Sequence, residues 1–142
     1  MSDDDEGFRQ YDPRTDAREQ AVMLLYESEQ RGVSSVELMN ERGLASEDLA
    51  RALLSGVEHS REQIDSHITA NARGWALDRM PALDRAILRL AIHELIDRAD
   101  VPVAVVIDEA VELAKRFSTD DSGRFVNGVL AAVAKNVRPS AT

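Results

Sequence analysis

The segment PALDRAILRLAIHELIDRADVP, residues 81–102, reads as one long buried helix that ends just before a second helix begins. Pro81 suits the first position of a helix, where its missing N–H is not needed. Pro102 favours the end of this helix and the start of the next one. The apolar residues recur at the three- and four-residue spacing of a buried helix face, at Leu83, Ile87, Leu90, Ala91 and Ile92.

Helical patterns continue on both sides of this segment, and no stretch alternates as a half-buried strand would. Asp12-Pro13 reads as a cap followed by proline, and Gly32 supplies a stop. Ser34 and Ser60 each open a capping-box pattern, which predicts further helix starts. The sequence therefore predicts an all-α chain of six to seven helices with short links, near residues 12–31, 34–43, 46–59, 60–74, 81–100, 102–117 and 118–139.

Two features of the C-terminal half carry packing expectations. In the helix after Pro102, the spacing places Phe117 on the buried side together with Val106 and Leu113. Gly128 lies within the last predicted helix, where glycine costs roughly 1 kcal/mol relative to alanine. Close packing against a neighbouring helix is the expected reason for that glycine.

Composition narrows the class of protein. The 142 residues suit one domain, 44% of them are hydrophobic, and the absence of cysteine excludes disulfides and thiol chemistry. No apolar run reaches the roughly 20 residues that cross a bilayer, which together with the lack of cysteine favours the cytoplasm. The net charge is −9, and residues 1–30 contribute much of it. We expect residues 1–11 to form a flexible acidic tail and residues 12–142 to form the domain.

Residues that could support catalysis or metal binding are better explained structurally. His93 begins a sequence resembling a zinc-protease helix, but Asp97 stands where the second histidine is required. The carboxylates of Asp108, Glu109 and Glu112 precede Lys115 and Arg116 at spacings that favour ion pairs within one helix. We therefore expect no catalytic residue, no metal and no cofactor.

The first helix carries the strongest binding signal. Arg14 and Arg18 are four residues apart near its start, and Tyr26 lies further along. Guanidinium groups contact phosphate and aromatic rings stack on unpaired bases, so this set suits single-stranded RNA. Ordinary surface charge is the alternative explanation, and the overall negative charge means that any RNA binding must come from a local patch.

Several segments together resemble the NusB family of transcription antitermination factors. They are AREQAVMLLY (17–26), WALDRMPALDRAILRLA (75–91), Glu94-Leu95, Val101-Pro102, IDEAVELAKRF (107–117) and FVNGVL (125–130). The resemblance spans roughly residues 16–138 and is weakest between residues 32 and 60. It implies an all-α fold of two helical subdomains. It also implies binding to boxA RNA, a single-stranded element of nascent transcripts, together with the ribosomal protein NusE, in an RNA polymerase antitermination complex that promotes read-through of ribosomal RNA operons.

The resemblance also implies site residues. Arg14, Arg18 and Tyr26 match RNA-binding positions of the first helix, and Asp121, Arg124 and Phe125 match RNA-binding positions near the start of the last helix. Asp84 and Arg89 match central-helix positions that face NusE. Family members often carry consecutive arginines where this chain has Arg14-Thr15-Asp16, so RNA affinity is expected to depend on NusE.

Two alternatives remain at this point. Some RNA cytosine methyltransferases carry a similar helical regulatory domain, and this chain would then be such a domain on its own. Some relatives are thought to form homodimers that cover the RNA surface. Trp75 and Phe125 would lie in that interface or in the core of the domain.

Overall fold

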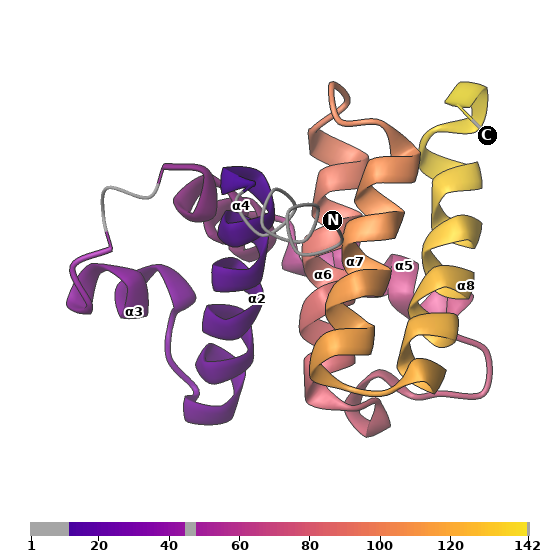
Figure 1. Cartoon of the computed structure of the whole chain (residues 1–142). Coiled ribbons are helices and arrows are strands. Elements are labelled where there is room, and N and C mark those ends of the chain that lie inside the picture. The colour runs from indigo at the N-terminus through magenta and orange to yellow at the C-terminus, as the bar shows by residue number, and fades with distance from the viewer. Residues whose placement is uncertain (1–11, 45–47, 142) are drawn as a thin grey trace, which may run out of the picture.

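A computed structural model of the chain describes residues 12–44 and 48–141. The predicted tail lies outside the described residues. Within these ranges every regular element is helical, which confirms the all-α prediction. The elements, labelled as in Figure 1, are α2 (Pro13–Arg31), α3 (Ser35–Glu41), α4 (Asp48–His59), α5 (Arg61–Asn71), the 3-10 helix η1 (Leu77–Arg79), α6 (Ala82–Asp97), α7 (Val103–Phe117), α8 (Asp120–Val137) and the 3-10 helix η2 (Pro139–Ala141).

The helices form two groups that meet at α6. Helices α2, α3 and α4 lie on one side of the molecule, and α6, α7 and α8 stand side by side on the other, with α5 behind them (Figure 1). Twelve consecutive residues of α6, Asp84 to Leu95, are buried, as the apolar run of residues 81–102 predicts. A continuous core joins both groups, with Val22, Leu53, Ile92 and Leu130 among its fully buried members.

Local capping explains several of the helix ends. The Asp12 carboxylate accepts a hydrogen bond from the Arg14 backbone N–H, and Gly32 ends α2 in the left-handed conformation with φ 68°. The predicted break after His59 is present, but the Ser60 side chain makes no capping hydrogen bond there. The capping box expected at Ser60 is therefore wrong, although the helix start that it predicted is correct.

Both packing expectations for the C-terminal half are wrong. Phe117 is 39% exposed at the end of α7, where the Arg116 guanidinium lies 4.8 Å from its ring centre. A Cβ at Gly128 would meet nothing within 4 Å, so no close helix contact requires that glycine. The glycine that does pack closely is Gly56 in α4, where a methyl group would overlap the imidazole of buried His93.

No helix in the described part of the chain is long and apolar enough to cross a membrane.

Candidate nucleic-acid interface

Arg14 lies at the exposed first turn of α2, beside an open cleft. The cleft has a volume of about 400 Å³ and lies between the start of α2 and the connector from α6 to α7. Arg14 and Arg98 line it together with the acidic side chains of Asp12, Asp100 and Glu109. Among the described residues, the guanidinium of Arg14 forms no ion pair, so it is available to an anion.

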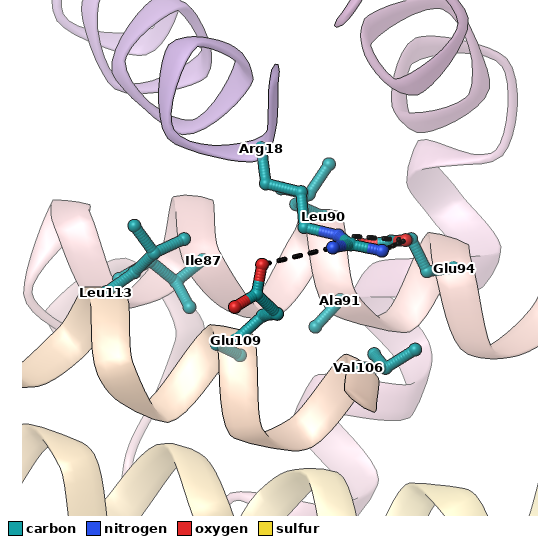
Figure 2. A pocket seen from close by; sticks show the side chains of 9 residues that line it. Arg18, Ile87, Leu90, Ala91, Glu94, Val106, Glu109 and Leu113 are labelled. Atoms are coloured by element: carbon teal, nitrogen blue, oxygen red, sulfur yellow. Dashed lines mark hydrogen bonds and ion pairs between the residues drawn. The ribbon is translucent and has the colours of Figure 1, made fainter. Parts of the chain in front are cut away.

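Arg18, one turn further along α2, points into the molecule (Figure 2). Its guanidinium donates hydrogen bonds to both carboxylate oxygens of Glu94 in α6, at 2.9 Å in the shorter contacts. It also donates to Glu109 in α7 at 3.1 Å. Because Arg18 is only 5% exposed, the expectation that it lies on a solvent-facing surface is wrong. Its charge is already neutralised where α2, α6 and α7 meet.

The charge state of Arg18 is set by this environment. Burial alone would lower the pKa of Arg18, but hydrogen bonds and the negative charges of Glu94 and Glu109 outweigh burial and hold that pKa above its ordinary value. The Glu109 carboxylate accepts a further hydrogen bond from the Thr15 hydroxyl at 2.7 Å. Arg18 therefore anchors the start of α2, and with it the neighbouring Arg14, to the central helices.

Glu109 and Arg116 also correct the expectation of ion pairs within α7. Glu109 binds Arg18 of α2, and Arg116 forms an ion pair with Glu19 of α2 at 2.9 Å. The acidic and basic side chains of α7 thus connect two helices, and they hold the C-terminal end of α7 beside α2.

The predicted residues of α8 gather at its first two turns. Asp121 and Arg124 are exposed and form an ion pair with each other. Phe125 is partly buried, and its ring centre lies 6.1 Å from that of Trp75 with the planes tilted by 55°. Trp75 is 49% exposed, so it is not a core residue. Helices α6 and α7 lie between α8 and α2, the helix that carries Arg14 and Tyr26 (Figure 1). Tyr26 is 39% exposed.

Asp84 and Arg89 of α6, the two positions that the resemblance assigns to NusE binding, are buried in this chain rather than exposed. Asp84, 2% exposed, accepts a hydrogen bond from the Ser122 hydroxyl at 2.9 Å, and this bond ties the start of α6 to the start of α8. Burial raises the pKa of Asp84, while hydrogen bonds from Ser122 and Ser118 oppose that rise. The surface exposure expected of Asp84 is therefore wrong.

Arg89 belongs to an ion-pair network around Glu29. Its guanidinium binds Asp65 of α5 at 2.8 Å and Glu29 of α2 at 2.7 Å. Arg85 pairs with the same Glu29 carboxylate, and this hydrogen bond is the main reason that the pKa of Glu29 falls to about 2, with Arg89 adding to the effect against burial. Arg89 is 7% exposed, so it too is engaged inside the chain, contrary to expectation. The open side of this network is a cleft of about 390 Å³.

Sequence reasoning missed the acidic partners of these arginines. Glu94 and Glu29 lie on predicted helices, but only the fold shows that they face Arg18 and Arg89. The sequence leaves Trp75 to a homodimer interface or to the core, and its exposure is seen only in the structure. No group of three or more potential metal-binding side chains occurs in residues 12–44 and 48–141.

The fold defines a small, all-helical protein that exposes one arginine near the start of each of two helices, Arg14 in α2 and Arg124 in α8. The NusB family model matches residues 15–135, and the chain belongs to the NusB family of transcription antitermination factors. A curated relative, the transcription antitermination protein NusB of Saccharopolyspora erythraea, is 51% identical over 128 residues, which cover 85% of this chain and 86% of the relative.

Solved structures agree with this membership. T. maritima NusB superposes with a TM-score of 0.82 at 34% identity, covering 91% of this chain and 95% of that one. A NusB chain from a crystal structure of NusB and NusE in complex with dsRNA superposes with a TM-score of 0.78 at 30% identity, covering 87% of this chain and 97% of that chain.

Proposed function

We propose that this chain binds boxA RNA together with NusE and acts within an RNA polymerase antitermination complex in the cytoplasm, where it promotes read-through of ribosomal RNA operons. The observation that carries the proposal is the match to a NusB chain solved together with NusE and RNA, over nearly the whole of that chain. The guanidinium of Arg14, which is exposed and forms no ion pair with any described residue, supports the RNA part of the proposal.

Within this proposal, the RNA-binding residues fall into two roles. Arg14, Tyr26, Arg124 and Phe125 contact RNA directly, and the Asp121 carboxylate limits the charge of Arg124 through their ion pair. Arg18 is a positioning residue, because its guanidinium is committed to Glu94 and Glu109.

The partner surface is proposed around the Glu29 network. Arg89 and Asp84 fix the positions of α5 and α8 relative to α6 through Asp65 and Ser122. They would thereby shape the surface that NusE meets, rather than supply its outermost contacts.

A titration of fluorescent boxA RNA with and without NusE tests the function. We expect weak binding by the chain alone and tighter binding with NusE, since each partner stabilises the binding of the other. A scrambled RNA of the same length is the control. If NusE neither binds the chain nor tightens RNA binding, the proposal is wrong.

The methyltransferase-domain alternative is less well supported. The curated relative matched over 86% of its own length is named as an antitermination protein.

A further inference from the structure

The surface around Trp75 holds an exposed ring that neither the core nor the proposed contacts explain. Trp75 is the only tryptophan in the chain, and at 49% exposure it is the most exposed of the large hydrophobic side chains in the described ranges. It lies in the connector between α5 and α6, just after Gly74, whose φ of 79° turns the chain there. An indole in such a position loses burial energy unless something covers it.

Phe125 contacts the indole of Trp75 but leaves part of the indole exposed. The ring centres are 6.1 Å apart and the planes are tilted by 55°, an arrangement typical of edge contacts between aromatic rings. A tilted neighbour orients Trp75 and leaves part of the indole surface free. Because Phe125 follows Arg124 directly in α8, the exposed indole continues the surface that we propose for RNA.

The surroundings of Trp75 carry a small local excess of positive charge, because Arg73, Arg79, Arg124 and Lys115 outnumber Asp78, Asp120 and Asp121. The connector of residues 72–80 carries two arginines, Arg73 and Arg79, and one acid, Asp78, in a chain whose net charge is −9. Both arginines are exposed, and neither forms an ion pair within the described residues. Lys115 of α7 adds another cation close to the start of α8, since its side chain packs against Gly123.

Trp75 is the only large hydrophobic side chain that is exposed in the connector of residues 72–80. Ala76, Asp78 and Arg79 around Trp75 are exposed, but only Trp75 among them is a large hydrophobic residue. An aromatic ring flanked by cations is an arrangement that binds unpaired bases.

We propose that Trp75, oriented by Phe125, is a stacking platform for an unpaired RNA base, with Arg73, Arg79 and Arg124 placed for the adjoining phosphates. This inference rests on the proposed RNA-binding function and extends it to the connector between α5 and α6.

Trp75 is its own probe, since every change in tryptophan emission of this chain comes from that residue. The full chain with NusE, whose own emission is subtracted, is titrated with fluorescein-labelled single-stranded boxA RNA. Anisotropy of the label reports binding, and an unlabelled copy of the RNA is used to follow tryptophan emission. We expect the emission of Trp75 to be quenched with the same midpoint as the anisotropy change.

Variants then separate stacking from charge. Trp75→Ala should weaken binding about 5- to 150-fold, the usual range for losing one stacked base, while Trp75→Phe should retain most of the affinity. Since stacking releases no counterions, the salt dependence of binding should keep its slope in Trp75→Ala. The control Val33→Ala removes apolar surface from another exposed site. It should leave the affinity for RNA and its salt dependence unchanged.

Three results would overturn the inference in distinguishable ways. If anisotropy reports RNA binding but emission and the affinity of Trp75→Ala stay unchanged, Trp75 is not a platform and the proposed function survives. If the wild-type chain with NusE binds no RNA, both fail. Emission that instead changes with protein concentration in the absence of RNA would assign Trp75 to a homodimer interface and contradict the RNA role.

Discussion

The guanidinium of Arg18 is enclosed by two carboxylates, Glu94 and Glu109, and contacts almost no solvent. A buried ion pair contributes little net stability when complete, but removing one partner leaves an uncompensated buried charge. At the residue scale, two arginines that lie four residues apart on α2 thus have different roles. Arg14 is exposed and forms no ion pair within residues 12–44 and 48–141, and Arg18 holds the helix that carries Arg14.

We predict that Arg18→Met lowers the free energy of unfolding by about 3 kcal/mol, because Glu94 is then left buried without its partner. Urea denaturation monitored by circular dichroism measures the loss. Adding Glu94→Gln to Arg18→Met should recover part of it, since the unpaired charge is gone. A loss below about 0.5 kcal/mol in Arg18→Met would show that the ion pair does not hold α2 in place.

The pairing of Arg18 could not be predicted from the sequence. Its partner Glu94 is 76 residues away, and a single sequence does not show which faces of two helices meet. From the sequence alone, an arginine near the start of a helix is therefore interpreted as a surface charge. The exposure of Trp75 was equally undetermined, because an aromatic residue in a connector packs inward or outward according to neighbours such as Phe125.

At the scale of the elements, the helix ends were largely predictable because caps are local. Asp12, Gly32 and Thr119 act within a few residues of the ends that they define. Packing between elements was less predictable. Two of the helical glycines show this, since Gly56 of α4 packs on His93 and Gly128 of α8 meets nothing within 4 Å.

These glycines give a matched pair of substitutions. Gly128→Ala should raise the free energy of unfolding by about 0.5–1 kcal/mol, the difference in helix propensity at an open site. Gly56→Ala should lower it by about 1–3 kcal/mol, because the new methyl group displaces the His93 ring. Thermal and urea denaturation of both variants check the signs. Equal effects at the two sites would contradict the packing of α4 against α6.

The network linking α2, α5 and α6 predicts a dependence on acid. The pKa of Glu29 is lowered to about 2 in the folded chain, so its ionised form stabilises the fold above the ordinary glutamate pKa. That contribution is lost as the pH falls from about 4.5 towards 2. Allowing for partial exposure, we expect it to be about 1–2 kcal/mol.

The variant Glu29→Gln should therefore be less stable than the wild type at pH 7 and should lose less stability below pH 4.5. Urea midpoints measured from pH 7 to pH 2.5 test this prediction. Parallel curves for the two proteins would show that Glu29 does not carry the acid dependence.

At the scale of the whole molecule, a net charge of −9 opposes the binding of RNA, which is also negatively charged. The account requires local cations at the starts of α2 and α8 to outweigh that repulsion once NusE supplies further contacts. Two variants of equal net charge separate the local effect from the global one. Arg14→Glu with Arg124→Glu alters the proposed surface. Arg31→Glu with Lys135→Glu alters the C-terminal ends of the same helices.

The most direct measurement is the affinity of NusE-bound protein for boxA RNA over a range of salt concentrations. We predict that Arg14→Glu with Arg124→Glu weakens binding roughly 30-fold or more, as expected for two charged contacts. It should also flatten the salt dependence by about 1.4 in slope, while the charge-matched control stays close to the wild type. If both double variants lose affinity equally, overall charge governs binding and the local surface proposed for RNA is wrong.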